Sequence, residues 1–171
     1  MVRKYVRLII AAIIFLGSIG LFVTGSIYWG ILVLLFSGLF VLAHFKNEKN
    51  LAAFYYLRKN KFEAAGSILS KVKHPESLIK SQEAYYYFLT ASIELQNHNN
   101  SKADKYFKKA LKIGLRLKTD QAIAKLNLSG ITLTRGNKQM AKRYLQEAKN
   151  LDDKKVLTPQ VKELEAMMKR M

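Results

Sequence analysis

Lysine is the residue type in this chain whose spacing points most directly to chemistry. One set recurs every three or four residues, the spacing that places side chains on one face of an α-helix. Its members are Lys102, Lys105, Lys109 and Lys112. A later set, Lys138, Lys142 and Lys149, roughly repeats the pattern. Clustered ammonium groups attract carboxylates and phosphates, so this basic surface is either a solvated face or a binding site for an acidic protein, a lipid headgroup or nucleic acid.

The charge balance of the chain favours the binding interpretation of these lysines. The chain of 171 residues carries 29 Lys and Arg against 12 Asp and Glu, a formal net charge of +17. Three of the basic residues and none of the acidic ones precede residue 46, so residues 46–171 alone carry about +14. An ordinary solvated face mixes both signs of charge. The chain has no glycine-rich phosphate loop and no aromatic and basic RNA-binding signature, which makes nucleic acid the less favoured anion.

Catalysis and metal binding, by contrast, have no support in the residue pattern. The chain has no cysteine, and His44, His74 and His98 are far apart in sequence. The acidic residues are scattered over several expected helices without the pairing that acid–base catalysis needs. We therefore expect no enzyme activity, with no catalytic residues, no metal site and no cofactor.

The most apolar stretch of the chain lies at its N-terminus. Residues 8–43 are thirty-six consecutive residues without a charged side chain. A single helix of that length would be about 54 Å long, nearly twice the hydrocarbon thickness of a bilayer. The turn-forming cluster Thr24-Gly25-Ser26 divides it into Leu8–Val23 and Ile27–Ala43. We therefore expect a transmembrane helical hairpin over residues 1–45, packed through Gly17, Gly20, Gly30, Ser37 and Gly38. A cleaved signal peptide and a hairpin that enters one leaflet are the alternatives.

Basic residues flank this stretch and predict its orientation. Arg3, Lys4 and Arg7 precede the first span, and Lys46 and Lys49 follow the second. Because positive residues stay on the cytoplasmic side, we expect an integral cell-membrane protein that crosses twice, with both termini cytoplasmic.

The rest of the chain resembles itself at a period of 38 residues. The stripe Ala65, Ile68, Leu69, Val72 recurs as Ala103, Tyr106, Phe107, Ala110 and as Ala141, Tyr144, Leu145, Ala148. Each stripe has the i, i+3, i+4, i+7 spacing of a helix face that packs on a neighbour. Turn residues precede each stripe, at Asn60-Lys61, His98-Asn99-Asn100 and Gly136-Asn137, and another helical run precedes each turn. We therefore expect three helix–turn–helix units over residues 46–157 and a C-terminal capping helix over 158–171.

These units resemble the tetratricopeptide repeat (TPR) family. The resemblance covers roughly residues 46–150, and its best segment runs from Tyr56 to Val72, with Asn60-Lys61-Phe62-Glu63-x-Ala65 at the turn. The period is four residues longer than the usual 34 of the family, and the family tryptophan is missing. The resemblance is to a small, membrane-anchored bacterial member. The expected fold class is all-α: a two-helix transmembrane hairpin, an α-solenoid of about three TPR-like helix pairs and a capping helix. A generic helical bundle is the alternative.

The resemblance implies that the first helices of the pairs line a concave groove. Carried over by position, the partner-binding groove comprises Asn50, Phe54, Arg58, Tyr85, Phe88, Ser92 and Gln96. The third repeat adds Leu126, Gly130 and Thr134. This lining lacks the polar donors with which some relatives hold a C-terminal carboxylate, so an apolar or amphipathic partner segment is expected. The alternative is that most of the aromatic residues are core.

The expected function is that of a membrane-anchored scaffold or adaptor. It would dock a membrane-associated protein or peptide at the cytoplasmic face of the bilayer. The alternative is a basic domain that contacts an anionic surface, such as lipid headgroups or the RNA of a ribosome, in place of a peptide.

Overall fold

The chain divides into two compact units, Met1–Glu48 and Lys49–Met171, in a computed structural model. The structure describes the backbone of residues 2–45 and 48–170 and the side chains of 9–38 and 48–170. Within these ranges all regular secondary structure is helical, which confirms the predicted all-α class. The elements are α1 (Val2–Val23), α2 (Ile27–Phe45), α3 (Glu48–Arg58), α4 (Phe62–Leu69), a 3₁₀ turn η1 (Pro75–Ser77), α5 (Lys80–Gln96), α6 (Asn100–Ile113), α7 (Lys118–Thr134), α8 (Lys138–Leu151) and α9 (Thr158–Arg170).

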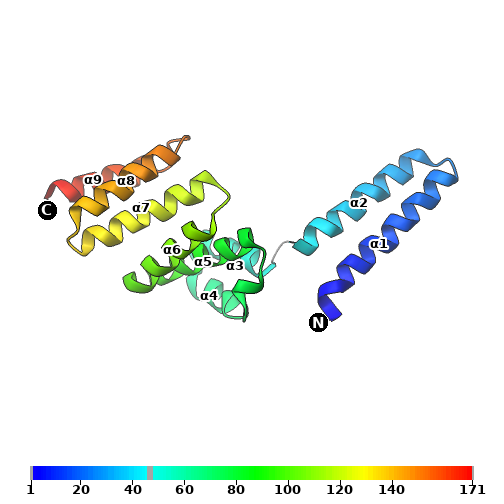
Figure 1. The fold of residues 1–171 in the computed structure, drawn as a ribbon, viewed down its shortest axis with the longest axis horizontal. Helices are drawn as coiled ribbons and strands as arrows, with labels where there is room; N and C mark the ends of the chain where they lie inside the picture. The colour runs from blue at the N-terminus through cyan, green and yellow to red at the C-terminus, as the bar shows by residue number, and fades with distance from the viewer. Residues whose placement is uncertain (1, 46–47, 171) are drawn as a thin grey trace. The chain divides into compact units, whose positions relative to one another are not determined.

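The first unit is a helical hairpin in which small residues form the contact between α1 and α2 (Figure 1). Ala11, Ser18, Gly30 and Ser37 are buried, in two pairs seven residues apart. The Ser37 hydroxyl donates to the carbonyl of Ala11 at 2.9 Å, from one helix to the other. A Cβ on Gly30 would come within 3.1 Å of the Phe22 ring. Small side chains therefore let the two backbones approach closely.

Three of the glycines expected at this contact lie elsewhere. A Cβ added to Gly17, Gly20 or Gly38 would meet nothing within 4 Å. The prediction was wrong for these three because glycine composition alone does not say which side of a helix faces its partner.

Several large apolar side chains of the hairpin are exposed. Ile13, Leu16, Trp29 and Leu35 are each more than 60% exposed. Among the residues that the structure describes, however, no helix is both long and apolar enough to cross a membrane. This finding contradicts the predicted transmembrane hairpin over 1–45 and the integral double-pass localisation with both termini cytoplasmic.

The uncharged part of each helix is shorter than a typical membrane span. The turn after Val23 divides the uncharged run of residues 8–43 between two helices. Its parts, 8–23 and 27–43, hold sixteen and seventeen residues, whereas a spanning helix needs about 20. The basic residues Arg3, Lys4, Arg7 and Lys46, on which the predicted orientation rested, lie outside the residues whose side chains the structure describes.

The hairpin contact predicts a specific disulfide. The chain is free of cysteine, so Ala11→Cys combined with Ser37→Cys in the full chain introduces one possible pair. We expect rapid crosslinking under mild oxidation, detected as a mobility shift on a non-reducing gel, because the two positions touch. Ala12→Cys with Ser37→Cys is the matched control, since Ala12 is exposed, and it should crosslink much more slowly. Equal crosslinking of both pairs would contradict the described contact.

In the second unit the same reversal of the chain occurs three times at intervals of 38 residues. Asn60, His98 and Gly136 have left-handed backbone, with φ of +56°, +59° and +79°. The amide that follows each of them donates to the carbonyl five residues back, in the pairs Lys61–Tyr56, Asn99–Glu94 and Asn137–Thr132. This is the hydrogen bond of a Schellman motif, which ends the first helix of each pair just before the second helix begins. The turns fall at the segments where the sequence predicted them.

The packing of the helix pairs repeats at the same interval. Ala65, Ala103 and Ala141 are fully buried, as are their counterparts Ala53, Ala91 and Ser129 on the preceding helices. Contact is extensive between α5 and α6 and between α7 and α8, and each pair runs as an antiparallel hairpin (Figure 1). Across α7 and α8 the Ser129 hydroxyl donates to the carbonyl of Ala141 at 2.7 Å. Small residues thus lie at the contact between α5 and α6 and at the contact between α7 and α8.

A row of aromatic residues runs from the first helix pair into the second. Phe107 on α6 is fully buried, and its ring centroid lies 6.0 Å from that of Phe88 on α5. Phe88 stacks on Tyr85 at 5.9 Å, and Tyr85 lies 6.0 Å from Phe54 on α3. This aromatic row joins α3, α5 and α6 in one core.

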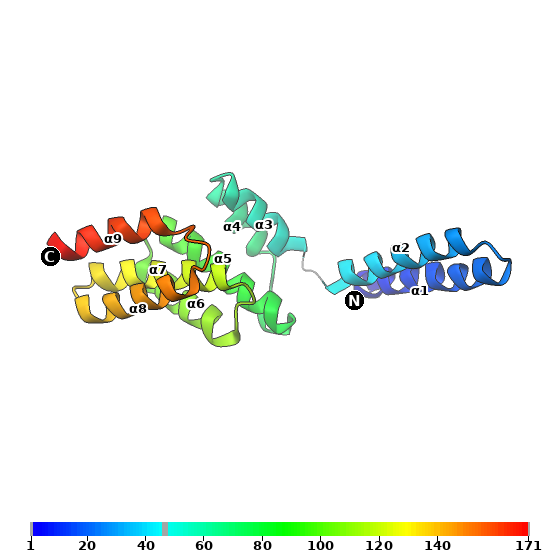
Figure 2. The same cartoon turned by 90° about the horizontal axis from the view of Figure 1, so that it is seen from above.

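The last helix, α9, packs on α7 and α8 (Figure 2). Val161 and Met168 on α9 are buried, and Leu164 packs on the same core cluster. The loop before α9 is fixed by Asp152, whose carboxylate accepts hydrogen bonds from the amides of Val156 and Leu157 at 3.0 and 2.8 Å. Apolar residues of the third pair are thereby covered.

The aromatic core predicts the cost of a cavity. We expect Phe107→Ala to reduce the free energy of unfolding by about 3–5 kcal/mol, because the ring is fully buried and its neighbours can close the space only in part. Urea denaturation followed by circular dichroism measures the change. Tyr55→Ala is the control, since Tyr55 is 53% exposed and its removal should cost much less. Similar losses in both variants would contradict the core position of Phe107.

Candidate anion-binding surface

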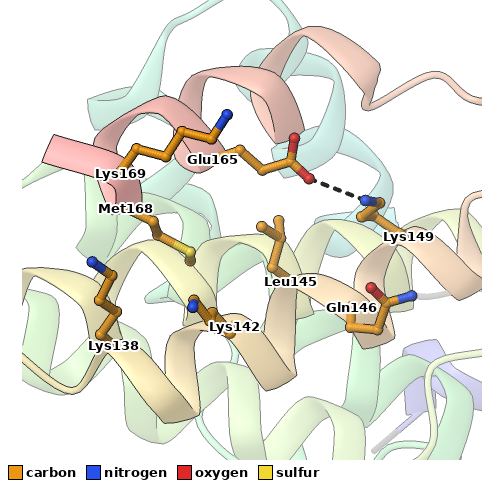
Figure 3. A pocket seen from close by; sticks show the side chains of 8 residues that line it. All are labelled: Lys138, Lys142, Leu145, Gln146, Lys149, Glu165, Met168 and Lys169. Atoms are coloured by element: carbon orange, nitrogen blue, oxygen red, sulfur yellow. Dashed lines mark hydrogen bonds and ion pairs between the residues drawn. The ribbon is translucent and has the colours of Figure 1, made fainter. Parts of the chain in front are cut away.

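The later lysine set, Lys138, Lys142 and Lys149, lines a cavity between α8 and α9 that has a volume of about 410 Å³. Figure 3 shows that three of its lysines come from α8 and one comes from α9. The lining residues are Lys138, Lys142, Leu145, Gln146, Lys149, Glu165, Met168 and Lys169. Four ammonium groups therefore surround a space that contains one carboxylate.

That carboxylate already pairs with one of the lysines. The Lys149 ammonium donates to the Glu165 carboxylate at 3.0 Å, from α8 to α9 (Figure 3). Both side chains are more than 40% exposed, so water screens the pair and its contribution to stability is small. The floor of the cavity is apolar, because Leu145 and Met168 lie there with only about 5% of their surface exposed. Because the Lys149–Glu165 pair is exposed to water, an anionic group that enters the cavity can compete with Glu165 for Lys149.

A second cavity, of about 360 Å³, adjoins the first along the same two helices. It shares Lys149 and Glu165 with the first cavity. Its other lining residues are Asp152, Lys155, Thr158, Val161 and Lys162. The two cavities meet at the Lys149–Glu165 ion pair, so together they form one basic groove between α8 and α9.

The lysines predicted as a basic surface on α6 divide into two groups. All four are exposed, and Lys102 and Lys105 form the first group. Lys109 and Lys112 line a third cavity, of about 530 Å³, with Lys80, Glu83, Lys108 and Ile113. The Lys109 ammonium donates to the hydroxyl of Tyr87 at 2.6 Å and lies 3.9 Å from the centroid of that ring. This hydrogen bond raises the pKa of Lys109 and commits the side chain to an internal contact.

Two of the residues predicted to line a partner-binding groove are buried in the core instead. Asn50 is 1% exposed, and its amide donates to the carbonyl of Gln82 at 2.8 Å. Phe88 is 6% exposed within the aromatic row. Their side chains are therefore used to join α3 to α5 and α5 to α6, and little of either reaches solvent.

The other residues of the predicted groove retain more exposure. Phe54 and Tyr85 are half-buried, and burial raises the pKa of Tyr85 to about 12. The Ser92 hydroxyl donates to the carbonyl of Phe88 on its own helix, and Gln96 is exposed. Arg58 is exposed, with its guanidinium 5.9 Å from the centroid of the Phe54 ring. Leu126, Gly130 and Thr134 line a cavity of about 270 Å³ with residues of α9.

An ion cluster connects α7 and α8. The Glu147 carboxylate on α8 accepts from Lys125 on α7 and, at 3.1 Å, from Arg143. The hydrogen bond from Lys125 lowers the pKa of Glu147 below its usual value, and Arg143 lowers it further. The cluster joins the two helices of the third pair.

The sequence prediction missed the contribution of α9 to the groove. Glu165 and Lys169 are four residues apart and flank the buried Met168, so both come to the edge of the face that packs on α8. The spacing of Val161, Leu164 and Met168 was the available signal, because it fixes which face of α9 is buried.

Comparisons with protein-family models, with curated protein sequences and with solved structures found no match. In the part of the chain that the structure describes, no group of three or more His, Asp or Glu side chains could hold a metal ion.

The ion cluster predicts a pH-dependent contribution to stability. Because the folded-state pKa of Glu147 is lowered, its stabilisation is present above the unfolded pKa of about 4.3 and is lost as the pH falls through the folded pKa. We expect Glu147→Gln to destabilise the chain by about 0.5–1 kcal/mol at neutral pH, and the difference from the wild type to vanish in acid. Urea unfolding across this pH range measures it. Glu63→Gln, at an exposed position of α4, is the control, and a constant difference at all pH values would contradict the assignment.

Proposed function

We propose that residues 49–171 act as a TPR-like docking scaffold for a protein partner. The observation that carries the proposal is the repetition of one helix pair in which small residues form the inner contact and lysines occupy the outer surface. Ala103, Phe107 and Ala110 are buried on α6, whereas Lys102 and Lys105 are exposed on the same helix. On α8, Ala141, Leu145 and Ala148 are buried and Lys142 and Lys149 are exposed.

The excess of basic side chains supports a partner with negative charge. Some lysines pair within the chain, such as Lys108 with Asp104 at 2.9 Å and Lys118 with Asp153 at 2.9 Å. With 29 basic and 12 acidic residues, most of the positive charge still has no internal counterpart. Complementary charge accelerates the association of two proteins and selects among partners, which suits a docking surface.

The second candidate function is contact with an anionic surface other than protein, such as lipid headgroups or RNA. The same exposed lysines support it. RNA binding needs more than charge, because single-stranded RNA is also held by stacking of its bases on aromatic or arginine side chains. The described lining of the α8–α9 groove contains neither.

Crosslinking in intact cells tests the scaffold proposal. The tagged full chain would be treated with a lysine-reactive crosslinker and purified, and its adducts identified by mass spectrometry. We expect one reproducible protein partner, linked through lysines of α6 or α8 and retained after RNase treatment. Lys102→Glu with Lys105→Glu should reduce its recovery.

The matched control reverses two exposed lysines that flank α4, by Lys61→Glu with Lys73→Glu, and should leave recovery unchanged. Recovery that depends on RNA would support the second candidate instead. The absence of any specific protein adduct would reject the scaffold function.

A further inference from the structure

The groove between α8 and α9 has an unbalanced set of charges along its whole length. Its six lysines are Lys138, Lys142, Lys149, Lys155, Lys162 and Lys169. Its two acidic residues are Asp152 and Glu165. Asp152 is committed to the loop, because its two carboxylate oxygens accept from the amides of Val156 and Leu157. Glu165 therefore remains as the carboxylate that can serve the lysines of the groove.

Glu165 occupies the centre of this groove. It belongs to the lining of both cavities, and its ion pair with Lys149 crosses from α9 to α8 between them. It thus holds the place that a carboxylate of a bound chain would take. Because the pair is exposed to water, an incoming carboxylate can exchange with Glu165 at small energetic cost.

We propose that the α8–α9 groove binds an acidic peptide segment of the docked partner. One carboxylate of the segment replaces Glu165 at Lys149. Others pair with Lys138, Lys142 and Lys169 at one end and with Lys155 and Lys162 at the other. This inference rests on the proposed scaffold function and names the partner chemistry of one of its surfaces.

The composition of the lining favours a peptide over nucleic acid. Leu145, Val161 and Met168 give the groove an apolar floor, and the alkyl stems of its lysines add apolar walls. Such a surface accepts aliphatic side chains between carboxylates. Among the described residues that line the groove there is neither an aromatic ring nor an arginine on which a base could stack. A central Glu165 also repels a continuous phosphate backbone more than it repels spaced carboxylates that can be placed around it.

Fluorescence anisotropy with the full chain tests the groove. The probe is a fluorescein-labelled peptide of alternating glutamate and alanine, and a peptide with glutamine in place of glutamate is its neutral counterpart. At physiological ionic strength we expect the acidic peptide to bind and the neutral one not to bind. Lys142→Glu combined with Lys162→Glu should weaken binding about tenfold or more, since it reverses one charge on each side of the Lys149–Glu165 pair.

Two further variants make the test specific to this groove. Glu165→Gln removes the internal competitor and should tighten binding about threefold or more. Lys102→Glu combined with Lys105→Glu makes the same change of charge on α6, outside the groove, and should alter affinity by less than about twofold. Circular dichroism melting curves check that each variant is folded, and most of the substituted side chains are exposed.

Four outcomes would overturn the inference. Equal weakening by the α6 variant would mean that net charge alone attracts the peptide. No effect of Glu165→Gln would mean that Glu165 does not hold the site of a ligand carboxylate. Displacement of the peptide by oligouridylate RNA at lower concentration than by unlabelled peptide would assign the groove to nucleic acid. A protein partner crosslinked in cells through α6, with no peptide binding here, would leave the scaffold function standing and reject the groove alone.

Discussion

Close approach of paired helices at small residues is the constraint on which the rest of this structure depends. Ala65, Ala103 and Ala141 allow it in the second unit, and each is fully buried. In both units a serine reinforces the contact by donating to a carbonyl of the facing helix, Ser37 to Ala11 and Ser129 to Ala141. Since a larger side chain would separate the backbones, these positions fix how the helices of a pair are rotated. They thereby decide which side chains face solvent.

The basic surface follows from that rotation. Once the alanine stripe of α6 or α8 faces its partner helix, the lysines between the stripe positions must lie on the other side. Repulsion between neighbouring lysines lowers the stability of such helices, and it is only partly offset by pairs such as Lys108–Asp104. A surface of this kind becomes more stable when negative charge is brought to it. Among the described residues, the groove at α9 and the cavity lined by Lys109 and Lys112 combine that charge with depth.

Local patterns in the sequence predicted the turns of the second unit. They did not predict which side chains become buried by packing between helices that are far apart in the sequence. The turns at Asn60, His98 and Gly136 could be predicted because helix ends depend on nearby residues. Asn50 and Phe88 were wrongly expected at a free groove, since their burial depends on α5 and α6 and not on their own spacing. The predicted membrane anchor was wrong even though the sequence placed its turn correctly, because the uncharged stretch on each side of that turn holds only sixteen or seventeen residues. Glu165 was missed because it lies on a helix first regarded as a cap.

The recurrence of one left-handed residue every 38 positions makes the second unit a modular assembly. Each turn between the helices of a pair is closed by hydrogen bonds among neighbouring residues, so its geometry does not depend on how many modules precede it. Duplication of a whole module would therefore extend the array without changing the joints inside the copies. Insertion of a single residue within a helix would act differently. It would rotate the helix residues that follow it by about 100°, so that a buried alanine would face solvent. Such an array thus tolerates the gain or loss of whole modules, whereas the gain or loss of part of a module disrupts its packing.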